Sequence, residues 1–282
     1  MVKEENVMRI TRFIVLAFAI ISLNACQKNI GESPEFYEMT FYGINAPFLK
    51  TVLNYDSVLW ESGDNIKVLW GNNQSSKATC TPYDFGRKAE ITATVESASS
   101  YYGVYPYSAT SSLSNGVLNV TVSSDQTGMF RDANIAVSKA DAERNMSFRH
   151  LVSWLEFTID TPGVLTFASD SSNPITGVIT VDGFDENLKP VYSVSGTGST
   201  VTIDVKSSGT YYIALLPDVT LEALDFTLND GGNKTHIYTQ CSLQMPAGKL
   251  LGLGNITEKF IKENGFGAKL ESFVIEEFDF EY

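Results

Sequence analysis

The feature that most constrains this chain is an alternation of apolar and polar residues with a period of two, repeated along most of its length. Side chains of a strand point to opposite faces in turn, so this alternation is typical of strands with one buried face. A helical period is almost absent, and the chain is therefore predicted to be all-β. The clearest runs are residues 91–95, 118–122, 155–159, 201–205 and 224–228.

Turn signals rich in glycine and asparagine separate these strands, at residues 62–65, 114–116, 182–183, 196–198 and 229–233. Short strands spaced by roughly 8–12 residues favour β-sandwich architecture. One sandwich rarely uses so many strands, so we expect two in tandem. The polar segment Ser138 to Asn145 carries four charges and no large apolar side chain, and is the expected boundary. The expected organisation is a leader (1–25), a tether (26–35), two sandwich domains (36–145 and 146–256) and a tail (257–282).

The beginning of the chain is typical of an export signal. Arg9 and Arg12 precede an apolar run at 13–23, which is far shorter than the roughly 20 residues that a membrane-spanning helix needs. Ala25 and Leu23 stand before Cys26 as in the lipobox of bacterial lipoproteins. We therefore expect Cys26 to be acylated and to become the first mature residue, with the lipid held in the cell outer membrane. A plain secretory peptide with an incidental cysteine is the alternative.

Composition excludes several classes of function. The net charge of −13 leaves no basic surplus with which to neutralise phosphates, so nucleic acid is not an expected partner. With two histidines and no cysteine pair at ligand spacing, no metal site and no cofactor are expected. No catalytic motif is present, and the chain is not expected to be an enzyme. Cys80 and Cys241 could form a disulfide in an oxidising compartment or remain free thiols.

The tail ends in the sequence FVIEEFDFEY, which has the pattern of a strand with one apolar and one acidic edge. A strand of this kind is not stable alone in water, so it must complete a sheet. The sheet belongs either to the same subunit or to another molecule, and the pattern alone does not decide between them. The candidate donor side chains are Phe273, Ile275, Phe278, Phe280 and Tyr282.

Five segments behind the cysteine resemble, in order, the motifs of the fimbrillins, the subunit family of type V pili from Bacteroidia. They cover most of the mature chain, and together they are more specific than any one of them. The segments are Trp60 to Val68 (WESGDNIKV), Tyr101 to Tyr107 (YYGVYPY), Phe148 to Phe157 (FRHLVSWLEF), Tyr212 to Pro217 (YIALLP) and Met245 to Leu250 (MPAGKL).

The resemblance implies two tandem transthyretin-like β-sandwich domains in a subunit of a surface fimbria. In this family a protease removes the first strand, and a strand from a neighbouring subunit fills the vacated groove. Residues 35–42 would be the removable strand here, and the tail the donor. Family members of the shaft usually carry an arginine after the first strand, whereas no arginine occurs here between Cys26 and Arg87, so Lys50 is the candidate processing site. An uncleaved, lipid-retained anchor subunit or a related surface adhesin is the alternative.

The implied partners are other fimbrial subunits in a head-to-tail polymer, the outer membrane through the lipid, and an unidentified ligand on a host or bacterial surface. A second hypothesis is a surface-exposed glycan-binding lipoprotein. It rests on Trp60, Trp70 and the tyrosines of YYGVYPY, which could form an exposed aromatic platform. The same side chains alternate along predicted strands, which favours a place in the core. His150 precedes an apolar strand and is expected to serve packing.

Overall fold

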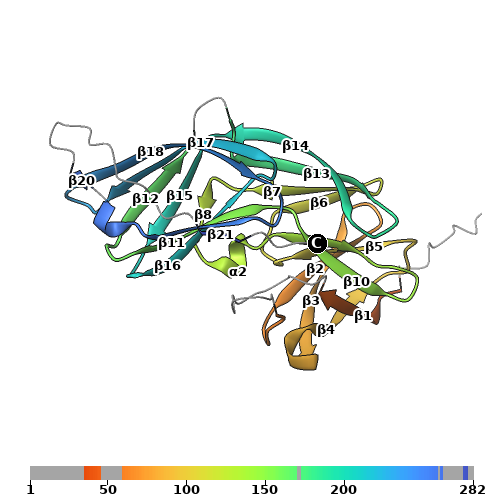
Figure 1. Ribbon diagram of the computed structural model, residues 1–282. Coiled ribbons are helices and arrows are strands. Elements are labelled where there is room, and N and C mark those ends of the chain that lie inside the picture. The colour runs from red at the N-terminus through yellow and green to blue at the C-terminus, as the bar shows by residue number, and fades with distance from the viewer. Residues whose placement is uncertain (1–34, 46–58, 170–172, 260, 263–275, 279–282) are drawn as a thin grey trace, which may run out of the picture. The chain divides into compact units, whose positions relative to one another are not determined.

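The computed structural model describes residues 35–45, 59–169, 173–259, 261–262 and 276–278 (Figure 1). Within these ranges the chain forms strands and turns, with one short α-helix, α2 (Phe130–Ala133), and two 3-10 turns, η1 (Asp84–Gly86) and η2 (Thr257–Lys259). The prediction of an all-β chain is confirmed. None of the helices in these ranges has the length and the apolar character needed to cross a membrane.

Seven strands close into a barrel (orange to yellow-green in Figure 1). Its interior contains fully buried aromatic residues, among them Phe41 and Phe148, with Trp60 packed beside them. Strand β2 shows the origin of this core, because Ile66, Val68 and Trp70 alternate toward the interior. The strands in barrel order are β1 (Tyr37–Asn45), β10 (Asn145–His150), β9 (Ala136–Lys139), β5 (Tyr101–Tyr105), β2 (Asn65–Trp70), β3 (Gln74–Tyr83) and β4 (Lys88–Val95).

The other strands form three open sheets. Strands of the first two of these sheets share a core of apolar side chains, centred on Phe157, Phe167 and Phe226, whose rings pack with centroids 4.9 and 5.4 Å apart. One sheet has the order β16 (Gly209–Leu215), β11 (Ser153–Ile159), β19 (Leu250–Asn255), β21 (Glu276–Phe278). The second has the order β20 (Ile261–Lys262), β18 (Lys234–Met245), β17 (Val219–Asn229), β12 (Gly163–Ala168), β15 (Thr200–Val205), β8 (Asp125–Gln126). The third has the order β14 (Pro190–Gly198), β13 (Thr176–Phe184), β7 (Val117–Val122), β6 (Ser111–Ser114).

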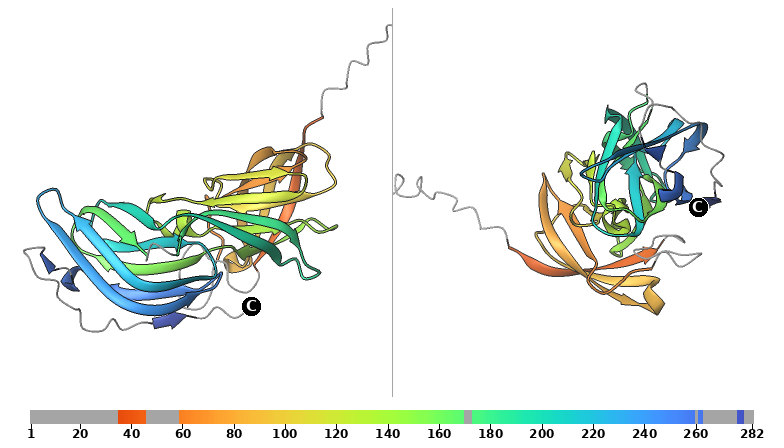
Figure 2. Two further views of the ribbon diagram at one scale, coloured as in Figure 1. Left: turned by 90° about the horizontal axis from the view of Figure 1, so that it is seen from above. Right: turned by 90° about the vertical axis from the view of Figure 1, so that its left-hand side faces the viewer.

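Strands from both sides of the expected domain boundary pair with one another. β13 pairs with β7 over residues 177–181 and 118–122, in a sheet that can be followed in Figure 2. The polar segment 138–145 forms the connection between β9 and β10, which are neighbours in the barrel. A further core cluster combines Leu69 and Val104 with Trp154 and Ile179. The division into domains at residues 145 and 146 stays a prediction.

Two expected turns are wrong. Residues 182–183 lie inside β13, and 196–198 form the end of β14. Their glycines do not reverse the chain, and those of β14 serve close packing. A Cβ on Gly196 would stand 2.2 Å from Cγ of Pro174, and Gly183 follows an irregularity in the pairing of β13 with β14. The expected turns at residues 62–65, 114–116 and 229–233 fall between strands, as predicted.

Candidate functional site

Strand β1 closes the barrel and is hydrogen-bonded along both of its edges. It runs antiparallel to β4, from Tyr37 opposite Val95 to Ile44 opposite Lys88. On its other edge it runs parallel to β10, over residues 42–45 opposite 145–148. Because these are the only connections between β4 and β10 in the barrel as described, removal of β1 would open the barrel along one side.

The inward face of β1 presents an aromatic side chain followed by a residue without one. Phe41 is fully buried and meets the ring of Tyr101 edge to face, with centroids 5.3 Å apart. Two positions on, a Cβ at Gly43 would stand 2.9 Å from Cδ1 of Ile91, so a side chain there would require the end of Ile91 to shift. The hydroxyls of Tyr37 and Tyr101 are hydrogen-bonded at 3.1 Å. Burial, together with this hydrogen bond, raises the pKa of Tyr101 to about 12, so its phenol is neutral at physiological pH.

The loop that enters β2 is held by a buried carboxylate, that of Asp64. The backbone N–H of Glu61 donates to its Oδ2 at 2.8 Å, and the hydroxyl of Tyr105 donates to its Oδ1 at 3.2 Å. The guanidinium of Arg131, on α2, lies 3.4 Å from Oδ1 and supplies an opposite charge. Burial and the nearby carboxylate raise the pKa of Tyr105, which therefore acts as a donor. The aspartate thus joins the start of β2, the end of β5 and α2.

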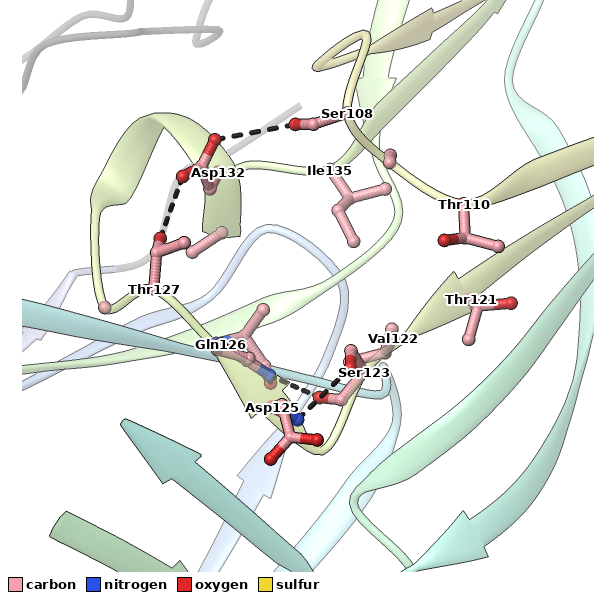
Figure 3. A pocket seen from close by; sticks show the side chains of 14 residues that line it. Ser108, Thr110, Thr121, Val122, Ser123, Asp125, Gln126, Thr127, Asp132 and Ile135 are labelled. Atoms are coloured by element: carbon pink, nitrogen blue, oxygen red, sulfur yellow. Dashed lines mark hydrogen bonds between the residues drawn. The ribbon is translucent and has the colours of Figure 1, made fainter. Parts of the chain in front are cut away.

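A pocket of about 220 Å³ opens where the end of β7, β8, the end of α2 and the loop after Tyr105 meet (Figure 3). Its lining has an apolar floor of small side chains and a rim of hydroxyl and carboxylate groups. This site was not predicted from the sequence. The signal available was the concentration of serine and threonine at residues 108–112 and 121–127, at strand ends and not on alternating faces.

The aromatic residues of the motifs are core residues. Trp60, Trp70 and Tyr105 are 5%, 3% and 2% exposed, and the other tyrosines of β5 are also buried. The interpretation of these side chains as core is confirmed, and they form no exposed platform for a sugar. The exception is Tyr107, which is exposed, and the centroid of its ring lies 5.4 Å from Nζ of Lys77.

The motifs agree with a comparison against models of protein families. The model described as fimbrillin-like matches residues 51–250, which span both the barrel and the open sheets. The chain belongs to the fimbrillin-like family. No curated protein matches this fimbrillin-like chain.

Solved structures that resemble this fimbrillin-like chain come from Bacteroidales, at low identity. A candidate cell adhesion protein from Bacteroides ovatus has 13% identity and a TM-score of 0.49, over 86% of this chain and 99% of that one. A fimbrial assembly protein from Parabacteroides distasonis has 7% identity and a TM-score of 0.37, over 78% and 91%. A fimbrial protein from Bacteroides ovatus has 10% identity and a TM-score of 0.34, over 79% and 49%. With TM-scores below 0.5, these likenesses transfer no function to the fimbrillin-like chain.

Most of the predicted site residues lie outside the described ranges. These are Cys26, the lipidation candidate, Lys50, the processing candidate, and the tail positions Phe273, Ile275, Phe280 and Tyr282. Phe278 is the last residue of β21, which pairs antiparallel with β19 of the same chain and places Phe278 opposite Leu250. The assignments of lipidation, processing and donor strand remain predictions.

The thiols and His150 have structural surroundings. Cys80 and Cys241 are free thiols, the first buried and the second half-buried, so the disulfide is not formed. His150 is buried with its ring edge-to-face on Trp154 at 4.7 Å, as expected of a packing residue. In the part of the chain that the structure describes, no three histidine, cysteine or acidic residues are grouped so that they could hold a metal ion.

Proposed function

We propose that this fimbrillin-like protein is a structural and adhesive subunit of a surface fimbria, assembled by protease-triggered strand exchange. Lipidated at Cys26, it is held in the outer membrane before assembly. Its partners are further subunits of the same kind, joined head to tail, and a ligand on a host or bacterial surface. Such insertion is heterologous, so it extends into a filament and does not close into a dimer.

The observation that carries this proposal is the position of β1. It is the first strand of the barrel, and both of its edges are paired. The chain that follows it, at residues 46–58, contains Lys50. A cut there separates β1 covalently from the rest of the barrel. What remains is a slot between β4 and β10 that offers backbone hydrogen bonds on two sides and a pocket for one aromatic side chain, which is the requirement for strand addition.

The described part of the tail makes a short pairing within its own subunit, which supports a role as a donor. Within residues 276–278, β21 pairs with β19 over three residues, whereas β1 pairs with β4 over eight. At a net gain of about 0.5–1.5 kcal/mol for each hydrogen bond, the ladder of these three residues contributes only a few kcal/mol at most. The alternation of Phe278 and Phe280 with acidic residues suits a strand that has one face in a barrel and the other in water.

We also propose that the barrel and the open sheets correspond to tandem transthyretin-like domains, with the division near residues 145 and 146. The barrel supports this, since six of its seven strands lie within residues 37–139 and it has its own core cluster, whereas β10 comes from beyond the division and β6, β7 and β8 join the open sheets. The glycan-binding alternative rested on Trp60, Trp70 and the tyrosines of YYGVYPY, and of these only Tyr107 is exposed, so they do not form an exposed aromatic platform. The fimbrial subunit is therefore the better-supported function.

The experiment is limited trypsin digestion of the lipid-free mature chain, residues 26–282, followed by electrophoresis and N-terminal sequencing. The expected product begins at Thr51 and forms SDS-resistant ladders. Lys50→Gln should prevent both, and Lys28→Gln is the matched control that removes a lysine before β1 and leaves both unchanged. Deletion of residues 270–282 should allow cleavage and abolish the ladders. Ladders that form without loss of β1, or in the absence of the tail, would contradict strand exchange.

A further inference from the structure

We propose that the pocket beside α2 binds one neutral sugar residue, such as the terminal hexose of a surface glycan. This inference is independent of strand exchange, since the pocket lies outside the barrel slot and is lined by neither β1 nor the tail. It gives the subunit a recognition site of its own.

The floor of the pocket is apolar and made of small side chains. Three alanines, at positions 109, 133 and 214, lie beside Val122 and Ile135, and all five are at most 9% exposed. The side chain of alanine is a single methyl group and fills little space. The hollow exists because three segments of the chain each contribute such a short side chain. An aliphatic floor of this kind suits the C–H face of a pyranose ring, whose burial is favourable.

The rim supplies hydroxyl and carboxylate groups at the edge of that floor. Figure 3 shows Asp132 and Thr127 on one side of the pocket and Thr110 and Thr121 on the other. Asp132 is held in place, because the hydroxyl of Thr127 donates to its Oδ2 at 2.8 Å and that of Ser108 to its Oδ1 at 3.5 Å. Carboxylates accept hydrogen bonds from sugar hydroxyls, and serine and threonine hydroxyls can both donate and accept.

The walls are fixed before any ligand arrives. The side chain of Gln126 donates through Nε2 to the carbonyl of Ala214 and accepts at Oε1 from its N–H, both at 2.8 Å, which ties β8 to β16. The indole of Trp154 donates to the carbonyl of Ala133 at 2.9 Å and so holds the end of α2. A preformed site loses less conformational entropy when it binds.

The lining also sets the class of ligand. Among the described residues that line it there is no lysine, arginine, histidine or aromatic residue, and the charged groups are Asp125 and Asp132. Anionic sugars such as sialic and uronic acids would face two carboxylates without a counter-charge and should be excluded. The volume of about 220 Å³ is below the usual range for drug-sized ligands, about 300–1,000 Å³, so a single ring is the appropriate size. Binding by one site should be weak, and repetition along a fibre would raise the avidity.

The test is saturation-transfer NMR and calorimetry on the full mature chain with the methyl glycosides of mannose, galactose, fucose, glucose and N-acetylglucosamine. N-acetylneuraminic acid and glucuronic acid are the anionic probes, and Nα-acetyl-lysine amide tests for a basic side chain. We expect saturable binding of at least one neutral glycoside and none of the acids. Asp125→Ala should weaken binding roughly ten-fold, the equivalent of one hydrogen bond to a charged group, and Thr110→Trp should abolish it.

Asp182→Ala is the matched control, since it removes an exposed carboxylate on β13 outside the pocket and should leave binding unchanged. All three substitutions are at exposed positions, and a thermal melt of each variant checks that the fold is retained. The proposal is overturned if no neutral glycoside saturates, if binding survives Thr110→Trp in a folded protein, or if the lysine derivative binds in place of the sugars.

Discussion

Replacement of Phe41 by alanine tests whether β1 holds the barrel closed. The side chain is fully exposed in an unfolded chain and 0% exposed here, and it loses its edge-to-face contact with Tyr101 when it is truncated. A buried phenylalanine replaced by alanine costs about 3–5 kcal/mol, the sum of lost burial and the cavity left behind. The total stability of a domain is only about 5–15 kcal/mol, so one substitution in β1 should remove a large part of it.

The assay is urea unfolding followed by tryptophan fluorescence. Trp60 is a suitable reporter because it packs within the barrel, 5.3 Å from the ring of Phe148. Phe41→Ala should lower the urea concentration at the midpoint of unfolding and leave the dependence of the unfolding free energy on urea concentration unchanged. It should lower the melting temperature by roughly 6–20 °C, at about 2–4 °C per kcal/mol. If the open sheets unfold separately, the barrel transition is the one that should move.

The matched control is Tyr42→Ala, one residue further along the same strand. Tyr42 is 40% exposed and faces outward, so its truncation should change stability by much less, near the 0.5 kcal/mol typical of surface positions. Equal effects of the two substitutions would mean that β1 contributes through its backbone alone. A loss below about 1 kcal/mol for Phe41→Ala would refute the argument that this side chain seals the barrel.

Three further predictions concern single residues. Phe85 is 90% exposed at a positive φ of 56°. Phe85→Gly should therefore relieve backbone strain and raise the free energy of unfolding by up to about 1 kcal/mol in the same urea assay. A lower free energy of unfolding would contradict this and show that the ring contributes a stabilising contact. Hydrogen bonds, first from the side chain of Asn255, lower the pKa of Asp160. The contribution of Asp160 to stability is therefore present above pH ~4, the pKa of an aspartate in the unfolded chain, and is lost as the pH falls through its pKa in the folded chain. Asn255→Ala should raise the pKa of Asp160 measured by NMR titration. Burial raises the pKa of Cys241 to about 11 and that of Cys80 further. Of these two thiols, Cys241 should therefore be labelled first by iodoacetamide, as followed by mass spectrometry. Faster labelling of Cys80 would contradict its burial.

Period-two alternation was sufficient for locating strands, because in β4 and β7 one face is buried and the other is not. Ile91, Ala93 and Val95 are all 2% exposed or less. The alternation also assigned Trp60 and Trp70 to the core. It failed for β14, where glycines required for close packing imitated a turn, and for β13, where Gly183 lies at an irregularity in the pairing with β14.

Strand pairing could not be predicted from the same pattern. β1 lies parallel to β10, about 100 residues further along the chain, and β13 lies beside β7. Alternation specifies which face of a strand is buried, and it carries no information about which edge meets which. The pocket escaped prediction for a related reason. Its alanines lie on three different elements, and a small residue signals a hollow only once its neighbours in space are known.

Three of the five motifs that carry the family resemblance meet in one cluster of the barrel. Trp60 packs edge to face on Tyr105 at 5.8 Å and on Phe148 at 5.3 Å, and the hydroxyl of Tyr105 donates to Asp64. The first three motifs therefore each supply one aromatic side chain to this cluster, which holds the entry to β2 against β5 and β10. At these positions the likeness to fimbrillins reflects contacts that close the barrel.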